Sequence, residues 1–599
     1  MQGGVRPHAV ARPFHRARVT SPLSRDADKG SRRAWTRALE VTGRATRDPA
    51  RTLPLALDEW AQQYGDRPAL IADEETYSFA RLSTRVRQYA RWALAQGVEK
   101  GATVALMMRN RPEYAAIWLG LTRIGAIVAL VSPDLQGAAL AHALRVAGAG
   151  LAIASTDAAV ALRQAGFSGA IWTYGAGERR LDEAVDLHCA AALADLESAK
   201  VTLDDRALRI FTSGTTGLPK AAEVSHRKII AWTHWFSGLA GLGESDRLYD
   251  CLPMHHSVGG VVALAAPLVG GGAAVIAPKF SARRFWHDVA RFECTAFQYI
   301  GELCRYLIAA PRPVPESCAR LRLALGNGMA PAVWAAFAER FPDIRILEFY
   351  ASTEGNVWLY NVEGRAGAIG RLPPFLAAKT PIALARFDEA TQAPLRGADG
   401  FCIDGDEGEA LGRIAGDAAS RFEGYSDERE TEKKVLRDVF ARGDAWMRTG
   451  DLMRRDAEGF YYFVDRMGDT FRWKGENVAT AEVAAALRGC PGVTDALVYG
   501  VEVANCDGRA GMATVVGSFD WRELERRLEA LPRWARPVFL RVTAEIARTE
   551  TFKPKRALYI ADGFDPGRSG DRLFVLGETG YQPLTRDIYA AILGGDWRL

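Results

Sequence analysis

One short segment constrains the fold of this chain more than any other. Residues 212–220 read Thr-Ser-Gly-Thr-Thr-Gly-Leu-Pro-Lys, and they follow an apolar run, 208–211, that is typical of a strand end. Hydroxyl donors, backbone N–H groups and a lysine in one loop are the groups that hold a polyphosphate, and glycine lets the backbone approach the anion. The pattern differs from the Walker A loop, G-x-x-x-x-G-K-[ST]. We predict a phosphate-binding loop after a strand; a polar surface turn is the alternative.

Length and composition bound the class of protein. The 599 residues exceed the size at which one hydrophobic core keeps growing, so two or more domains are expected. A hydrophobic content of 48% and a charged content of 25% are ordinary for soluble proteins. The net charge of +4 is small for this length and argues against nucleic acid as the main partner. The eight cysteines form no C-x-x-C pair, which indicates a reducing compartment without a disulfide framework or zinc site.

The N-terminal segment differs in charge from the rest of the chain. Residues 1–51 hold twelve Arg or Lys and four Asp or Glu, a net charge of +8. The segment lacks the apolar stretch of a secretory signal, so we expect residues 1–50 to be a basic, disordered extension; a transit-like or membrane-surface role is the alternative. Residues 259–277 carry no charge, but their glycines and proline favour a buried helix–strand pair over a membrane span. We expect a cytoplasmic protein, with peripheral association at the inner face of a membrane left open.

From about residue 55 onward, helix-like and strand-like patterns alternate. Short apolar runs at 102–107, 127–131 and 151–154 are separated by helical patterns that begin at Pro112 and cover 136–147. This βαβ order predicts an α/β fold with parallel sheets that helices cover on both faces.

A charged, glycine-containing break follows the apolar run 460–464. We place the domain boundary at this break. Residues 51–465 would form a large domain, and residues 466–599 are enough for a small α+β domain.

Three further segments carry groups that suit nucleotide chemistry. Residues 350–356 follow an apolar strand and offer an aromatic ring, hydroxyls and one carboxylate, Glu354. The ring could stack on a base, and Mg²⁺ prefers one or two carboxylates with phosphate oxygens. Asp451, in a glycine turn, could accept hydrogen bonds from ribose hydroxyls, and Lys553, next to Pro554, could present its charge to a phosphate. Each segment alone could instead be an ordinary turn or a surface lysine.

Four such segments in this order, with a glycine-containing break between the last two, resemble the acyl-activating (adenylate-forming) enzyme superfamily. The resemblance covers about residues 55–595. It implies a large, multi-layered N-terminal adenylation domain and a smaller, mobile C-terminal domain with a hinge near Gly468. Within the superfamily the chain is most similar to the fatty acid transport protein / very-long-chain acyl-CoA synthetase branch, through segments 422–425, 437–440, 443–446 and 463–478.

The resemblance also implies which residues bind the nucleotide and the metal ion. Tyr350 would pack against adenine, Thr353 would lie near the α-phosphate, and Glu354 would hold Mg²⁺. Asp451 would hold the ribose hydroxyls, with Arg466 beside it. The remaining implied contacts are Asn327 and Gly328 on the adenine side, and Thr212, Ser213, Gly214, Thr215, Thr216, Gly217 and Lys220 around the ATP phosphates.

Two residues of the small domain complete the implied site. Lys553 would assist adenylation, with Lys555 as a nearby alternative, because Phe552 stands where the superfamily usually has glycine before this lysine. Gly475 would line the CoA side once the small domain has turned about the hinge. The implied catalytic residues are therefore Lys553, Thr353, Glu354 and Lys220.

The implied activity is ATP-dependent ligation of a long- or very-long-chain fatty acid to CoA through an acyl adenylate. The products are acyl-CoA, AMP and pyrophosphate, and the reaction requires ATP, Mg²⁺ and CoA. A carboxylate is a weak nucleophile, so such an enzyme has to neutralise charge and position the reactants. Two alternatives stay open: a fatty acyl-adenylate ligase that forms no thioester, and a membrane-associated fatty acid import protein. Acyl-chain length and oligomeric state are left open by the sequence.

Overall fold

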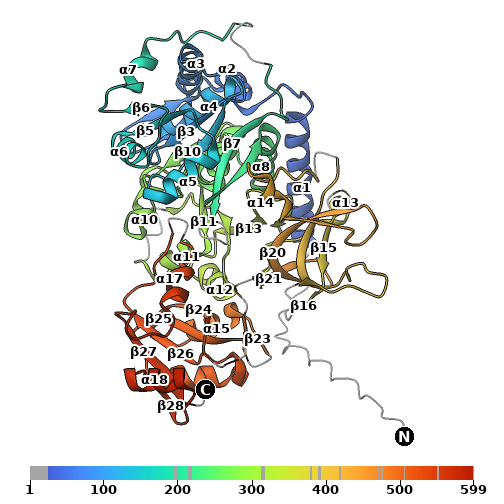
Figure 1. Cartoon of the computed structure of the whole chain (residues 1–599). Coiled ribbons are helices and arrows are strands. Elements are labelled where there is room, and N and C mark those ends of the chain that lie inside the picture. Colours follow the sequence, from blue (N-terminus) through green and yellow to red (C-terminus); the bar gives the residue numbers. More distant parts are fainter. Residues whose placement is uncertain are drawn as a thin grey trace.

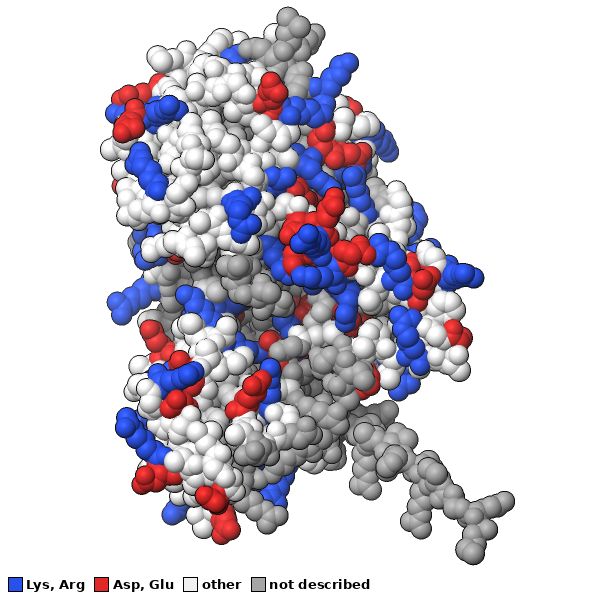
Figure 2. Space-filling model, in the orientation of Figure 1, with Lys and Arg blue, Asp and Glu red and all other residues white. Residues whose placement is uncertain are grey.

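The molecule consists of a large α/β body and a smaller C-terminal body, which lies beneath it in Figure 1. Basic and acidic side chains are interspersed over the face shown in Figure 2, in agreement with the small net charge. The computed structural model describes residues 25–597 with the exception of 195–199, 214–218, 312–317, 378, 380, 389–392, 417–419, 468, 470, 474–475, 505, 507 and 550–551.

The first sheet has six strands in the order β6-β5-β3-β4-β7-β8. All neighbouring pairs are parallel except β7–β8, which is antiparallel. The predicted strands and helices of this region are confirmed to within one or two residues. Continuous apolar runs such as β4, which is buried along its whole length, are typical of strands covered on both faces. The bounds are β3 (Thr103–Met107), α4 (Pro112–Arg123), β4 (Ile127–Leu130), α5 (Gly137–Ala147), β5 (Leu151–Ser155), α6 (Thr156–Gln164), β6 (Ala170–Tyr174), α7 (Leu181–Asp186), β7 (Arg206–Ser213) and β8 (Pro219–Ser225).

The second sheet has eight strands in the order β14-β13-β12-β11-β9-β10-β1-β2, antiparallel only at its two edges. The bounds are α2 (Leu53–Tyr64), β1 (Pro68–Ile71), β2 (Thr76–Ser78), α3 (Phe79–Ala95), α8 (His226–Ala240), β9 (Arg247–Asp250), the π-helix η1 (Val258–Ala263), α9 (Leu264–Val269), β10 (Ala273–Ile276), α10 (Ala282–Arg291), β11 (Ala296–Ile300), α11 (Gly301–Ala309), β12 (Leu323–Asn327), α12 (Pro331–Arg340), β13 (Arg345–Ala351) and β14 (Trp358–Asn361).

The uncharged segment 259–277 forms the predicted buried helix–strand pair, as η1, α9 and β10. Gly260 is required there, because a Cβ atom at this position would lie 1.8 Å from the carbonyl oxygen of Met254. Within the described part of the chain, no helix is long and apolar enough to cross a membrane.

The expectation of a disordered N-terminal extension is wrong for part of its length. Residues Arg25–Ala45 form helix α1, which lies beside α8 (Figure 1). Trp35 is 1% exposed, and its ring lies edge-on to those of Trp235 and Tyr360, with centroid distances of 5.9 and 6.0 Å. The apolar residues of α1 recur at helical spacing within a basic segment, so net charge concealed an amphipathic helix. Residues 1–24 lie outside the described part.

A third, antiparallel sheet completes the large body, and a separate core forms the small one. The predicted architecture, a large domain with parallel sheets and a smaller α+β domain, is thereby confirmed. The third sheet comprises β15 (Ile382–Ala385), β18 (Glu407–Arg413), β19 (Val435–Arg437), β20 (Ala445–Arg455) and β21 (Tyr461–Arg466), near α13 (Pro374–Ala377) and α14 (Glu428–Glu432). The small body comprises β22 (Phe471–Trp473), β23 (Glu476–Val478), α15 (Thr480–Arg488), β24 (Val493–Glu502), β25 (Arg509–Gly517), α16 (Trp521–Glu529), β26 (Phe539–Thr543), α17 (Arg556–Asp562), β27 (Arg572–Gly577), β28 (Gly580–Pro583) and α18 (Arg586–Gly594).

Candidate active site

The predicted phosphate loop lies at the tip of the β7–β8 hairpin. Thr212 pairs in register with Lys220, and Ser213 pairs with Pro219. The Lys220 ammonium lies 2.5 Å from a carboxylate oxygen of Glu430 and 5.7 Å from the centre of the Tyr425 ring. The structure therefore holds the loop's lysine beside an anionic side chain. The other predicted loop residues, Gly214, Thr215, Thr216 and Gly217, lie outside the described residues.

Tyr425 links the β7–β8 hairpin to Glu354, which follows β13. Burial and the carboxylate of Glu354, which is hydrogen-bonded to the Tyr425 hydroxyl, raise the pKa of Tyr425. Thr212 is hydrogen-bonded to the same hydroxyl. The Thr353 hydroxyl lies 3.1 Å from the hydroxyl of Ser257, which precedes η1. Thr353 and Glu354 thus lie between the phosphate hairpin and the η1 segment.

Glu354 fits the role of a single protein ligand to Mg²⁺. Where the chain is described, no group of three or more His, Cys, Asp or Glu side chains could hold a metal ion by itself. Mg²⁺ is usually bound by one or two carboxylates, with substrate phosphates and water completing its octahedron. One carboxylate next to a phosphate hairpin is consistent with that donor set.

The predicted adenine side lies at the carboxyl end of β12. Gly328 has a φ of +77°, which turns the chain at this point, and the buried Oδ1 atom of Asn327 has no hydrogen-bond partner in the described structure. An unpaired buried acceptor costs free energy, and an amino group of a bound base is a donor that could satisfy it.

Glu348 holds the backbone of this turn by a hydrogen bond, and the sequence did not predict this role. Its carboxyl group accepts hydrogen bonds from the backbone N–H of Met329, at 3.0 Å, and from the Tyr299 hydroxyl. Complete burial raises the pKa of Glu348 to about 8, although both hydrogen bonds lower it. A carboxylate in the apolar strand β13 was the available sequence signal.

The predicted ribose site joins three strands. Asp451 on β20 pairs in register with Arg466 on β21, whose Nε lies 3.2 Å from Asp451 Oδ1. The other carboxylate oxygen accepts a hydrogen bond from the Tyr350 hydroxyl on β13. Asp451 is 6% exposed, so its orientation is fixed by these neighbours. The structure therefore brings Tyr350, Asp451 and Arg466 together.

Lys553 reaches this site from the small body. Partial desolvation and the charge of Arg466 lower its pKa, while Glu354 and Asp451 oppose that shift. His256 also lies near it, because the charge of Lys553 contributes, after burial and His255, to the lowered pKa of His256. Lys553 is exposed, so the lysine faces the predicted metal ligand, the predicted ribose ligand and the histidine pair at the range of charge interactions. The hinge residue Gly468 and the CoA-side residue Gly475 lie outside the described residues.

A second lysine near Glu354 was also missed. Lys228 lies in the first turn of α8, and its buried Nζ has no hydrogen-bond partner in the described structure. The ammonium lies 5.5 Å from the centre of the Trp232 ring, and burial lowers its pKa against the opposing charges of Glu423 and Glu354. Its helical position, four residues before Trp232, gave no signal in the sequence.

Comparison with known proteins identifies the family. The family model described as "AMP-binding enzyme" matches residues 57–409, more than half of the chain. The chain belongs to the AMP-binding enzyme family. The family members with related sequences include human long-chain fatty acid transport protein 1, which is 37% identical over 92% of this chain and 88% of its own length. Mouse long-chain fatty acid transport protein 3 is 40% identical over 85% of this chain and 79% of its own length. These relatives confirm the branch predicted from the sequence.

Solved structures of two other proteins share the fold. ATP-bound MatB from Rhodopseudomonas palustris superposes with a TM-score of 0.72 at 21% identity, covering 84% of this chain and 98% of that protein. The anthranilate CoA ligase AuaEII in complex with anthranoyl-AMP gives a TM-score of 0.71 at 20% identity, covering 84% and 95%.

Proposed function

We propose that this member of the AMP-binding family is an AMP-forming acyl-CoA ligase for long- or very-long-chain fatty acids. The observation that carries the proposal is the contact between the two bodies next to Lys553, where the Phe552 ring packs against Phe280 and Tyr306 of the large body. Lys553 thereby comes within the range of charge interaction with Glu354, Asp451 and Arg466. A lysine carried by the small body can assist adenylation in one orientation of that body and leave the nucleotide site in another.

In the proposed first step, the fatty acid carboxylate attacks the α-phosphorus of ATP and pyrophosphate leaves. Lys220 and the hydroxyl groups around it bind the departing phosphates, and Asp451 fixes the ribose so that the attacking and leaving oxygens are in line. Lys553 stabilises the negative charge that develops on the α-phosphate. Mg²⁺ bound at Glu354 would neutralise phosphate charge.

In the proposed second step, the CoA thiolate attacks the acyl carbonyl and AMP leaves. The thiolate needs access to the side of the site that Lys553 occupies, so the small body has to turn away first. We assign this turn to Gly468 and the resulting CoA contact to Gly475.

The proposed acyl group follows the relatives' printed name, long-chain fatty acid transport protein. The apolar surroundings of η1 and α8 offer Trp232, Trp235 and His256 as candidate residues of the wall of the acyl-binding tunnel. We propose that fatty acid import, where it occurs, results from conversion of the acid to its CoA thioester, which traps it. We also propose that the protein associates peripherally with the membrane.

A panel of acids of different chain length, assayed with ATP, Mg²⁺ and CoA, tests the activity. We expect AMP, pyrophosphate and acyl-CoA, with the highest kcat/KM for long chains. Release of ADP and orthophosphate would exclude the proposal, and adenylate formation without thioester would identify an acyl-adenylate ligase.

The role of Lys553 is tested by measuring the two half-reactions separately. Lys553→Ala should reduce acid-dependent ATP–pyrophosphate exchange by about 10²–10³-fold and still convert added acyl adenylate and CoA into thioester. Lys555→Ala is the matched control, because it removes a lysine two residues away. Equal loss of both half-reactions in Lys553→Ala would reject the assignment.

A further inference from the structure

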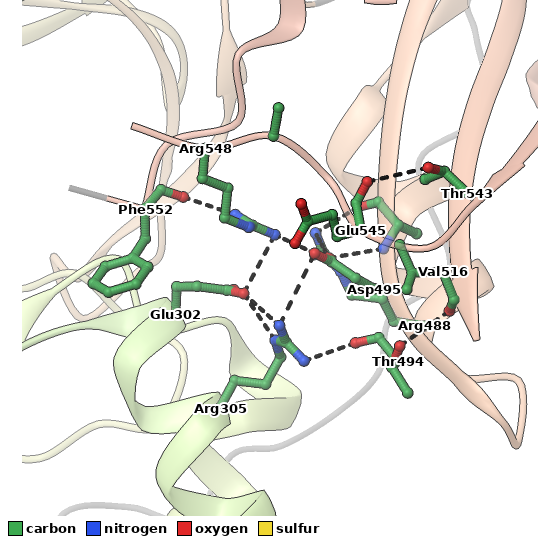
Figure 3. Close-up of polar contacts among 12 residues, drawn as sticks. Glu302, Arg305, Arg488, Thr494, Asp495, Val516, Thr543, Glu545, Arg548 and Phe552 are labelled. Carbon is green, nitrogen blue, oxygen red and sulfur yellow. Dashed lines mark hydrogen bonds and ion pairs between the residues drawn. The ribbon is translucent and has the colours of Figure 1, made fainter. Parts of the chain in front are cut away.

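A cluster of charged side chains joins the two bodies (Figure 3). Glu302 and Arg305 lie on α11 of the large body, and Asp495 and Arg548 belong to the small body. Glu302 Oε1 lies 2.5 Å from Arg305 and 3.3 Å from Arg548, and Arg548 also pairs with Asp495. Arg488 of the small body also lies 3.6 Å from Asp495, so the large body contributes one carboxylate and one guanidinium to the shared network, and the small body one carboxylate and two guanidinium groups.

Backbone contacts and burial make this network specific. The Arg305 guanidinium lies 4.0 Å from Asp495 and donates a hydrogen bond of 2.7 Å to the carbonyl oxygen of Thr494. The side chains of Glu302, Asp495 and Arg548 are 17%, 8% and 12% exposed. Interactions between charges are stronger where water is largely excluded, and forked guanidinium contacts fix geometry as well as energy.

Phe552 connects this network to Lys553. Its carbonyl oxygen accepts a hydrogen bond of 2.7 Å from Arg548 Nη1. Its ring packs against Phe280 and Tyr306 of the large body, with centroid distances of 5.6 and 6.0 Å. The residue has a φ of +59°, a conformation that a side chain with a Cβ atom adopts at a cost. The ring and carbonyl contacts offset this cost and fix the backbone immediately before Lys553.

We propose that Glu302, Arg305, Asp495, Arg548 and Phe552 form a latch that holds the small body in the orientation in which Lys553 reaches the nucleotide. The latch rests on the proposed function, because it favours adenylation over thioester formation. Its residues are positioning residues and take no part in the chemistry. The latch would have to open before thioester formation. The strength of its contacts therefore sets the balance between the rates of adenylation and of thioester formation.

Two variants weaken the latch without requiring a new backbone conformation. Glu302→Gln removes the carboxylate charge shared by Arg305 and Arg548 while keeping the shape of the side chain. Phe552→Gly removes the ring, and glycine adopts a positive φ readily. Glu523→Gln is the matched control, because Glu523 contacts Arg526 and Arg527 at 2.8 Å entirely within the small body.

Both half-reactions are measured for each variant. We expect Glu302→Gln to slow acid-dependent ATP–pyrophosphate exchange roughly tenfold, the typical effect of losing a charge-assisted contact. Phe552→Gly should slow it by about the same factor, because it removes the ring packing against the large body. The rate of thioester formation from added acyl adenylate should stay unchanged or rise. Glu302→Asp, which keeps the charge, should recover part of the exchange rate. Equal losses in both half-reactions, or no loss in either, would overturn the proposal.

Small-angle X-ray scattering of the ligand-free proteins gives a readout that does not depend on activity. At low ionic strength, wild type and Glu523→Gln should fit the orientation in Figure 1, and Glu302→Gln should depart from it. Added salt should change the wild-type scattering little, because partly buried charge pairs are screened much less than exposed ones. Identical scattering from all three proteins would reject the latch. Absence of exchange activity in wild type would instead reject the proposed function and leave the scattering result to decide the latch.

Discussion

The ammonium group of Lys220 lies 2.5 Å from a carboxylate oxygen of Glu430, and both side chains are largely buried, at 17% and 19% exposure. Lys220 is on β8, next to the predicted phosphate loop, and Glu430 is on α14. A lysine that binds ATP phosphates cannot keep all its contacts with a carboxylate at the same time. Under the proposed function, Glu430 would therefore compete with ATP for this cation.

Glu430→Gln should lower the KM for ATP, roughly fivefold, because the phosphates then no longer displace an ion pair worth about 1 kcal/mol. The measurement is steady-state pyrophosphate release at varied ATP. Glu432→Gln serves as the control, since Glu432 pairs with Arg437 at the exposed surface. A rise in KM for Glu430→Gln would show that Glu430 positions Lys220 for binding.

Asp451→Asn should raise the KM for ATP about tenfold, because a carboxylate is a stronger acceptor of hydroxyl hydrogen bonds than an amide. The same substitution should change the KM for 2′-deoxy-ATP much less. Tyr350→Phe removes the hydroxyl that orients Asp451 and should reproduce a smaller part of the effect. Equal effects on both nucleotides would argue against contact with the 2′-hydroxyl.

Trp35→Ala should lower the free energy of unfolding by about 3–5 kcal/mol, the usual cost of truncating a buried aromatic side chain. Trp35 is 1% exposed against α8, whereas Leu39 on the same helix is 38% exposed, so Leu39→Ala is the control with an expected loss below about 1 kcal/mol. Denaturant unfolding measures both. Similar values for the two variants would mean that α1 does not dock as described.

Glu348→Gln should alter how stability depends on pH. The pKa of Glu348 is raised from 4.5 to about 8, so between these values the folded protein keeps a proton that the unfolded chain releases. This contribution is complete below the unfolded pKa and is lost as pH rises through about 8, at about 1.4 kcal/mol per pH unit. The glutamine variant lacks it. Its stability relative to wild type should therefore increase from about pH 5 to about pH 8 in paired melting experiments; a constant difference would contradict the raised pKa.

Much of the fold was predictable because its signals are local. The strands β3, β4 and β5 and the helices α4 and α5 follow from apolar runs and helical spacing within a few residues of sequence. Helix α1 was missed because the basic composition of residues 1–51 concealed its helical spacing, and because the docking of Trp35 onto α8, about 200 residues away in the chain, stabilises it.

In the candidate site, too, the chemical groups were predictable from the sequence and the contacts between them were not. The sequence by itself determined the chemical groups: a lysine-terminated hydroxyl loop at 212–220, a carboxylate at Glu354, another at Asp451, and Lys553 near the end of the chain. Their functional roles stay predictions. Only the tertiary structure decided which groups meet: that Tyr350 orients Asp451, that Glu430 pairs with Lys220, and that Arg548 and Phe552, just before Lys553, contact the large body. The physical reason is that side-chain chemistry is fixed residue by residue, whereas these contacts depend on packing between elements far apart in the chain and on how two bodies are oriented.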